Sequence, residues 1–312
     1  MKNPIARAAI IAALLVLAGA VFAKQPRLKV ALTFDDLPLN GTQPAGKSQE
    51  QITRETVAVL KKHRIPPSFG FINARGLERN PDGARALQIW IASGNPLGNH
   101  TYSHMSLTKN PAGDFEQEIL RNEPVLELLT PANAKSDWHW LRYPFLHEGD
   151  TVEKRRAVRE FLRTNGYRVA QTTLDWEDYL WNSAHARCLD KGDKASIEWL
   201  RSSYLAEAER WIRLQRGFSK QVWGRDINHV LLLHLGSFSS TILPDLFALL
   251  DREGFDIVTL EEAQSDPIYQ SDPDIGEPNG GTLTELMMAS KGIPWPKNIA
   301  DKPRDKLGTL CQ

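Results

Sequence analysis

The chain has 312 residues, of which 38 are basic, 38 are acidic and 41% are hydrophobic, and it contains two cysteines. A charge balance this close to neutral argues against nucleic acid or an anionic membrane surface as the partner. The length allows one large α/β domain to bury a full core without a disulfide framework. Composition therefore leaves a globular protein.

Residues 1–23 have the pattern of a secretory signal peptide. Two basic residues precede an apolar run at 8–21, and the small residue Ala23 follows it. The run is short and alanine-rich for a membrane span, with an uncleaved anchor as the alternative. Removing this leader takes away two basic residues and no acidic ones, so the remaining chain has a net charge of −2. We expect an exported protein, periplasmic or extracellular, that makes no membrane contact after cleavage.

After the leader, short β-rich runs alternate with longer amphipathic runs. The predicted strands are Leu28–Thr33, Ser68–Ile72, Pro96–Gly98, Trp138–Arg142, Arg168–Thr172, His229–His234 and Asp256–Thr259. The predicted helices between them are Gln49–His63, Asp82–Ser93, Asp114–Leu129, Thr151–Asn165 and Leu243–Glu253. This alternation predicts a parallel sheet with helices packed outside it. Seven strands favour an irregular (β/α) barrel over an open sheet.

Two segments depart from the alternation. Glu177–Arg225 is too long for one crossover and has helical spacing between residues 195 and 215, which predicts a helical insertion at about 180–226. From Ser265 onward proline, glycine, aspartate and lysine predominate, which predicts an extended, loosely packed tail. We expect three parts, a signal peptide, a barrel domain with its insertion and a C-terminal tail, at residues 1–23, 24–265 and 266–312.

Cys188 and Cys311 are predicted to form a disulfide. Export places the chain in an oxidising compartment, where an exposed free thiol is a liability. Such a bond would join the tail to the main body of the protein. Two free thiols are the alternative, and neither cysteine has neighbours at metal-ligand spacing.

The first and third strands end in side chains that can hold a metal ion. In parallel αβ barrels the reactive groups collect where the strands end. Asp35 and Asp36 end the first strand, so one carboxylate can ligate a metal while the other stays free as a base. His100 and His104 follow the third strand, and histidines four residues apart on a helical turn can reach one cation. Each pair alone has a simpler explanation, a turn before Pro38 or a chance spacing, but together they predict a catalytic metal site.

Three further strands end in polar or aromatic residues. Arg142 ends the fourth strand and can pair with a carboxylate of the first strand. The fifth strand leads into the acidic and aromatic segment Asp175–Tyr179, and the sixth ends in His234. Singly, Arg142 is explained as a surface residue and His234 as a core histidine. The joint occurrence of these groups favours a metal-assisted hydrolase.

These motifs resemble those of the polysaccharide deacetylases with a NodB homology domain, carbohydrate esterase family 4. The resemblance runs from about Leu28 to Ala263, apart from the insertion. Five segments carry it in family order: Thr33–Pro38 (TFDDLP), His100–His104 (HTYSH), Arg142–Phe145 (RYPF), Asp175–Tyr179 (DWEDY) and Leu232–His234 (LLH). Four residues depart from the usual Gly, Pro, Tyr and Trp of these motifs, namely Leu37, Tyr143, Phe145 and Tyr179.

The resemblance implies a hydrolase on a seven-stranded (β/α) barrel that removes N-acetyl or O-acetyl groups from a carbohydrate, and the leader predicts that this enzyme is exported. It implies a divalent metal held by Asp36, His100 and His104. Zinc is the first expectation, and cobalt, nickel and manganese are the alternatives.

The resemblance also implies a role for each remaining polar residue. Asp35 would be the general base that takes a proton from the attacking water, and His234 the general acid that protonates the leaving group. Arg142 would orient Asp35, and Asp178 would keep His234 charged. The backbone N–H of Phe145 would stabilise the oxyanion, so replacement of the usual tyrosine side chain should be tolerated.

Aromatic and apolar residues near the strand ends are candidates for contact with sugar rings. Tyr143, Trp176, Tyr179 and Leu232 are predicted to line the substrate site, which would take an acetylated glycan or a small acetamide. Trp199 and Trp211, at helical positions in the insertion, are expected in the core. The insertion can cap the groove and thereby select short oligomers or non-sugar amides.

Two other functions remain open from the sequence. One is a metal-independent hydrolase of linear or cyclic amides on the same barrel, which a chelator would leave active. The other is a non-catalytic carbohydrate-binding protein, which would bind glycans without releasing product. The acidic and histidine pairs argue against the second, because binding alone needs neither a base nor an acid beside a metal.

Overall fold

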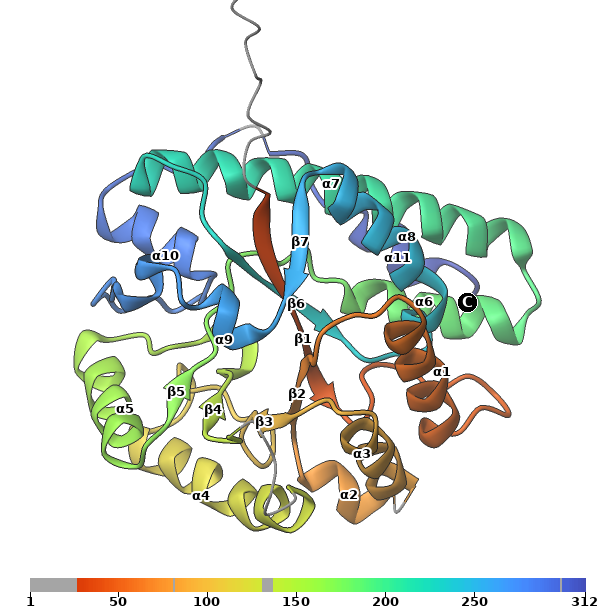
Figure 1. The fold of residues 1–312 in the computed structure, drawn as a ribbon, viewed down its shortest axis with the longest axis horizontal. Helices are drawn as coiled ribbons and strands as arrows, with labels where there is room; N and C mark the ends of the chain where they lie inside the picture. The colour runs from red at the N-terminus through yellow and green to blue at the C-terminus, as the bar shows by residue number, and fades with distance from the viewer. Residues whose placement is uncertain (1–26, 81, 131–136, 298) are drawn as a thin grey trace, which may run out of the picture.

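The computed structural model describes residues 27–80, 82–130, 137–297 and 299–312 (Figure 1). The strands are β1 (Leu28–Leu37), β2 (Phe69–Ile72), β3 (Leu97–Asn99), β4 (Trp140–Leu141), β5 (Arg168–Val169), β6 (His229–His234) and β7 (Phe255–Val258). The longer helices are α1 (Gln49–Lys62), α3 (Asp82–Ala92), α4 (Ala112–Leu129), α5 (Val152–Thr164), α6 (Tyr179–Asp190), α7 (Lys194–Trp223), α8 (Ser239–Arg252) and α10 (Leu283–Ser290). Short helices are α2 (Arg75–Arg79), α9 (Leu260–Ala263) and α11 (Arg304–Thr309), with 3-10 turns at Pro144–Leu146 and Pro267–Gln270. The signal peptide predicted at 1–23 lies outside the described residues.

Every predicted strand and helix is present, and all but β6, which has the predicted bounds, have shifted ends. All the strand pairs of the sheet are parallel, in the order β5-β4-β3-β2-β1-β6. β1 has β6 along one edge. Along its other edge, β1 pairs first with β7 and then, nearer its C-terminal end, with β2. A bridge between Leu174 and Leu231 brings the chain after β5 back to β6, so the sheet curls round upon itself. The fold is therefore a curled parallel sheet surrounded by helices, consistent with the predicted (β/α) barrel.

β1 pairs with three other strands, β2, β6 and β7, and shows why the strand ends meet. Its residues Val30–Phe34 are fully or almost fully buried, as expected for a strand covered on both faces. Its register sets Asp35 beside His234 of β6. The registers of the next strands set Ile72 beside Asn99, and Asn99 beside Leu141. The residues that follow these positions consequently gather at one end of the sheet.

The chain between β5 and β6 forms α6 and the 30-residue α7. The helical spacing seen at residues 195–215 lies inside α7. Asp193 caps the helix by accepting a hydrogen bond from Ser196 N, and Gly224 ends it at a φ of 73°. The buried residues of α7 recur every three or four positions, which gives one face of the helix to the core: Leu200, Tyr204, Ala208, Trp211, Ile212, Gln215, Phe218 and Val222.

The C-terminal tail is packed more tightly than its composition predicted. Leu283 and Met288 of α10 are at most 2% exposed and share an apolar cluster with Phe218 of α7. Composition misses this because a few apolar residues at helical spacing are sufficient to bury one face of a short helix. Cys188 and Cys311 form the predicted disulfide, which joins the end of the chain to α6.

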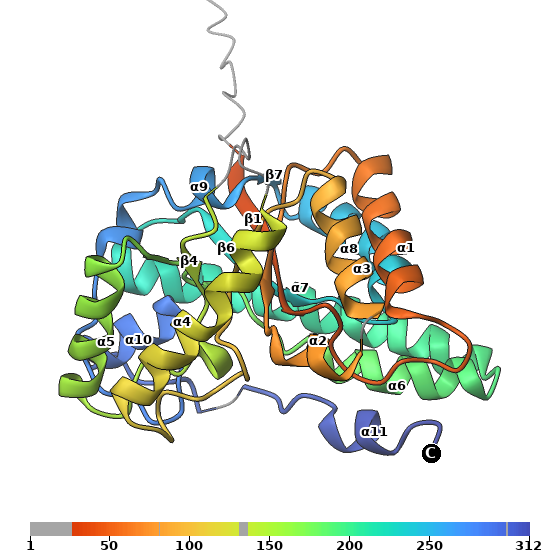
Figure 2. The same ribbon diagram turned by 90° about the horizontal axis from the view of Figure 1, so that it is seen from below.

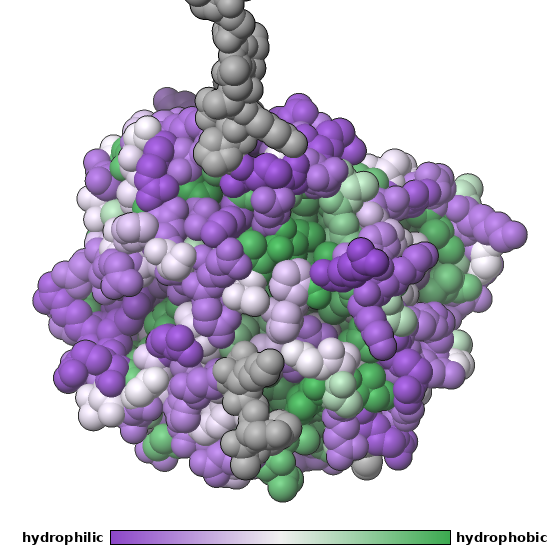
Figure 3. All heavy atoms as spheres, in the orientation of Figure 1, coloured by the Kyte–Doolittle hydropathy of each residue, from purple (hydrophilic) through white to green (hydrophobic). Residues whose placement is uncertain are grey.

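One face of the molecule is polar over much of its area (Figure 3). Figure 3 shows a mostly hydrophilic face, with hydrophobic residues in smaller areas between the elements. Among the described residues, no helix combines the length and the apolarity that a membrane crossing requires.

Candidate active site

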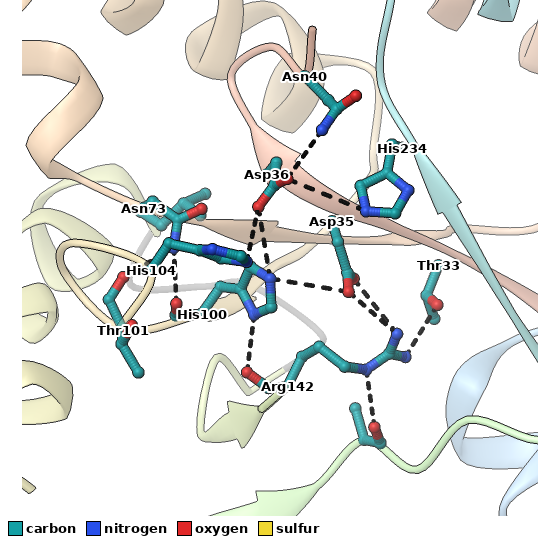
Figure 4. Close-up of polar contacts among 12 residues, drawn as sticks. Thr33, Asp35, Asp36, Asn40, Asn73, His100, Thr101, His104, Arg142 and His234 are labelled. Carbon is teal, nitrogen blue, oxygen red and sulfur yellow. Dashed lines mark hydrogen bonds and ion pairs between the residues drawn. The ribbon is translucent and has the colours of Figure 1, made fainter. Parts of the chain in front are cut away.

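Asp35 and Asp36, at the end of β1, both face the same cluster of side chains (Figure 4). In a regular strand adjacent side chains point to opposite faces. Asp36 breaks this alternation because its φ is 60°, in the left-handed region that non-glycine residues seldom occupy. His104 has the same φ of 60°. Uncommon backbone conformations thus occur at two of the predicted metal ligands.

Asp36, His100 and His104 form a candidate metal centre. Their ligand atoms lie within 4.8 Å of one another. Asp36 Oδ1 is 3.5 Å from His100 Nε2 and 3.3 Å from His104 Nε2. This buried oxygen accepts no hydrogen bond from any described residue. An unpartnered carboxylate oxygen facing two imidazole nitrogens is a donor set that fits a divalent cation such as zinc.

The neighbours of these three residues prepare them as ligands. His100 Nδ1 lies 2.7 Å from the carbonyl oxygen of Arg142, which can only accept, so Nδ1 carries the proton and Nε2 is left with a lone pair. Burial, together with the nearby His100, lowers the pKa of His104 to about 4, which keeps its ring neutral near pH 7. Asn40 Nδ2 donates to Asp36 Oδ2 at 2.9 Å, which leaves Oδ1 directed at the histidines.

Burial acts to raise the pKa of Asp36. The nearby rings of His100, His234 and His104 outweigh this effect and hold the pKa of Asp36 below its usual range. The Asp36 side chain is therefore a carboxylate at neutral pH, as a metal ligand must be.

Asp35 lies beside the candidate metal centre, with Oδ2 3.8 Å from His100 Nε2, and is bound to Arg142. Arg142 Nη1 is 3.3 Å from each carboxylate oxygen of Asp35, and both side chains are buried. Arg142 is fixed from two other directions, because Nε donates to the carbonyl of Ala170 at 2.8 Å and Nη2 donates to Thr33 Oγ1 at 2.9 Å. The carboxylate of Asp35 is therefore held in a fixed orientation beside the candidate metal centre.

His234 is held by Asp178 at the opposite side of Asp36. Its Nδ1 is 2.6 Å from Asp178 Oδ1, and its backbone N donates to Asp178 Oδ2 at 2.9 Å. Burial acts to lower the pKa of His234, but Asp178, with Asp36 and Asp35 behind it, raises the pKa to about 9. His234 Nε2 is 3.9 Å from Asp36 Oδ2. The side chain therefore carries a proton at neutral pH and presents it beside the metal centre.

A cavity of about 610 Å³ opens beside these residues. Tyr143, Phe145, Tyr179 and Leu232 line it as the sequence predicts. Phe145 is 57% exposed, and its ring centroid lies 4.3 Å from that of His104.

The prediction that Trp176 lines the site is wrong. Trp176 is fully buried and packs edge-on against Tyr204 of α7, with ring centroids 5.8 Å apart. Its neighbours Asp175 and Glu177 line the cavity, so the segment alternates between the cavity and the core. Trp211 was expected in the core, and it is 7% exposed there, but it also borders the cavity.

Several cavity residues were not assigned a role from the sequence. Asn40 is four residues from Asp36 in the same loop, so its proximity was available as a signal. Asp175 and Glu177 lie inside the motif Asp175–Tyr179. The remaining residues come from the turn after β4, from α10 with its preceding turn and from the tail, where no local motif marks them: Leu146, Asn279, Gly280, Gly281, Thr282, Glu285 and Lys302.

Comparison with known proteins identifies the family of this chain. The sequence profile of the polysaccharide deacetylase family matches residues 23–186, more than half of the chain. The chain belongs to the polysaccharide deacetylase family. This segment contains the three candidate metal ligands as well as Asp35, Arg142 and Asp178, while His234 lies beyond it.

Curated relatives of the family are similar over about half of this chain. A chitin deacetylase of Arthroderma benhamiae is 27% identical over 150 residues, which are 48% of this chain and 35% of that protein. A peptidoglycan-N-acetylglucosamine deacetylase of Bacillus cereus is 25% identical over 158 residues, which are 51% of this chain and 49% of that protein. The aligned part of the chain thus spans from about a third to about half the length of these relatives.

Solved structures support the fold. A pseudoenzyme of the CE4 family from Bacillus anthracis superposes with a TM-score of 0.50 at 14% identity, covering 76% of this chain and 65% of that one. A mutant described as a CE4 family pseudoenzyme with restored enzymatic activity gives a TM-score of 0.50 at 16% identity, over 76% of this chain and 67% of that chain. Because a pseudoenzyme has the same fold, the fold alone does not establish activity, and the residues of the site decide it.

Proposed function

We propose that this polysaccharide deacetylase family member is an exported, zinc-dependent enzyme that hydrolyses acetyl groups, chiefly N-acetyl groups, on a carbohydrate. The observation that carries the proposal is the unpartnered Asp36 Oδ1 facing His100 and His104, with a separate base and a separate acid beside it. A carbohydrate-binding protein has no use for this division of roles.

The chain's own residues supply the proton transfers. Asp35, fixed by Arg142, takes a proton from the water that attacks the acetamide carbonyl. His234, kept charged by Asp178, donates its proton to the leaving amine nitrogen as the C–N bond breaks. A divalent metal bound by Asp36, His100 and His104 would activate that water and polarise the carbonyl.

Phe145 is proposed to act through its backbone. Its φ of 59° places it in the left-handed region at the cavity mouth. There its N–H would donate to the carbonyl oxygen as negative charge develops, a contribution typically of about 3–4 kcal/mol for one donor.

The substrate class rests on the relatives and on the cavity lining. Relatives of this chain are named for chitin, peptidoglycan N-acetylglucosamine and chitooligosaccharide. The cavity combines carboxylates with the rings of Tyr179 and Trp211, the groups that bind sugar hydroxyls and sugar faces. We therefore propose glycans that contain N-acetylglucosamine. Export is supported by the leader pattern and by the Cys188–Cys311 disulfide, since such bonds persist in oxidising compartments.

Acetate release from a panel of N- and O-acetylated oligosaccharides tests the proposal. It compares metal-free protein, zinc-restored protein, Asp35→Asn, and Asp114→Asn, a control on the exposed first turn of α4. We expect release that needs zinc and that Asp35→Asn reduces by about 10²–10⁴-fold without loss of bound zinc, while the control keeps full activity. Activity that survives chelation would favour the metal-independent amide hydrolase. Glycan binding without acetate release would favour the binding protein.

A further inference from the structure

The cavity has a second wall, formed by elements other than the strand ends, which the family match at residues 23–186 only partly includes. Trp211 of α7 and Lys302 of the tail belong to this wall. Lys302 Nζ is 3.2 Å from Glu177 Oε2 and 4.7 Å from the centre of the Trp211 ring. The Lys302 side chain, only 12% exposed, therefore bridges the β5–α6 loop and α7 by an ion pair and a cation–π contact.

Several contacts hold this part of the tail in place. Arg304 forms a second ion pair with Glu177. Arg187 of α6 donates to the carbonyls of Leu307 and Leu310, at 2.6 and 3.0 Å. The disulfide to Cys188 closes the end. Figure 2 shows the tail running from α10 along one side of the molecule to α11, which contacts α6.

On its other side, the metal centre borders an open groove. Asp36 and His104 line a second recess of about 400 Å³, together with Asn73, Arg75 and Tyr102. The candidate metal centre therefore lies between two spaces. One is bounded by α7 and the tail, and the other has no contribution from either of these elements.

We propose that the wall of Trp211 and Lys302 ends the substrate path, so that this protein acts on the acetylated sugar at or near one end of a glycan chain. This proposal rests on the proposed function. The terminal sugar occupies the cavity, and the rest of the chain leaves through the groove beside Asn73 and Arg75. A cavity of about 610 Å³ has the size of a small-molecule site. A chain that continued past the terminal sugar would have to displace Lys302 from Glu177 and Trp211.

The wall also offers partners for the end of a sugar chain. Asp175 and Glu285 border the cavity, and each is only partly exposed. Glu285 is oriented by the backbone N–H of Thr282 at 2.8 Å and by Gln215 Nε2 at 3.1 Å. Oriented carboxyl groups beside an aromatic ring suit the free hydroxyls that a terminal sugar has and an internal sugar lacks.

Binding of end-blocked oligosaccharides tests this inference. The protein is full-length Asp35→Asn loaded with zinc, which should bind substrate without hydrolysing it. The probes are the β-1,4-linked pentamer of N-acetylglucosamine and two derivatives that carry a bulky group at one end or the other. We expect one derivative to bind like the parent pentamer and the other to bind at least about tenfold more weakly. Calorimetry measures all three.

Two lysine variants, each combined with Asp35→Asn, test whether Lys302 is the residue that excludes the blocked pentamer. Lys302→Ala should restore much of the lost binding. Lys306→Ala, whose Nζ lies 3.7 Å from the Trp199 ring centre outside the cavity lining, should not. Equal binding of both blocked pentamers would overturn the proposal that the wall ends the substrate path, and it would leave the proposed substrate class unchanged. Failure of every pentamer to bind would overturn the proposed substrate, and the proposal about the wall with it.

Discussion

The two walls of the cavity are built in different ways. On the metal side, Asp35, Asp36 and His234 end neighbouring strands, and the sheet register places them together. In the second wall, Trp211 comes from a long helix and Lys302 from the tail, which a disulfide and ion pairs attach to α6 and the β5–α6 loop. The sheet therefore positions the residues proposed for catalysis, while the helix and the tail outside the sheet limit which substrates can enter the cavity.

The largest effect is expected from loss of a metal ligand. His104→Ala removes one of the two imidazoles facing Asp36 Oδ1, so zinc affinity should fall sharply. Activity should fall by more than about 100-fold, because loss of a residue that only hydrogen-bonds to a metal ligand already costs up to about that factor. Zinc content after dialysis and acetate release measure the two effects. His139→Ala, at a part-exposed histidine paired with Asp137, is the matched control. Retained zinc and activity in His104→Ala would refute the ligand set.

Removal of the disulfide should affect the second wall and leave the metal side intact. The bond spans 123 residues, so a double variant, Cys188→Ser with Cys311→Ser, should lose about 2–5 kcal/mol of the free energy of unfolding. Urea denaturation measures this loss, and zinc titration should show unchanged affinity. An unchanged unfolding midpoint would mean that the tail is held by its other contacts alone.

The pairing of His234 with Asp178 predicts a specific pH effect. Asp178→Asn removes the negative charge that favours the protonated imidazole, so the pKa of His234 should fall from about 9. The alkaline limb of the kcat/KM profile, where the acid loses its proton, should then move to lower pH. Activity at neutral pH should fall by less than the roughly 10²–10⁴-fold that loss of a general acid costs. An unmoved limb would remove His234 from the role of acid.

The smallest effect is expected at Phe145. Phe145→Gly keeps the backbone N–H and relieves the φ of 59°, which glycine adopts freely. If the residue acts through its backbone, kcat should fall by far less than the about 10²–10³-fold cost of losing an oxyanion donor. Steady-state kinetics measure kcat and KM separately. A fall in kcat as large as the cost of losing an oxyanion donor would show that the phenyl ring of Phe145, and not its backbone N–H, contributes to catalysis.

Much of the metal side could be predicted from the sequence because its residues are local in the chain. Asp35 and Asp36 are adjacent, and His100 and His104 are four residues apart, so each pair is legible before any folding is known. Trp176 shows the limit of this reasoning. It lies inside a motif, but the alternation of the segment turns it toward Tyr204 and the core.

The sequence by itself determined the alternation of strands and helices, the five strand-end motifs and the cysteine pair, because all of these depend on residue type and short spacing. Only the tertiary structure decided that Lys302 meets Trp211 and Glu177, and that the tail borders the cavity. Those contacts join residues about 90 and 125 positions apart, where no periodicity links the partners. Their position follows from the packing of α10 on α7 and the attachment of the tail to α6, which exist only in the folded chain.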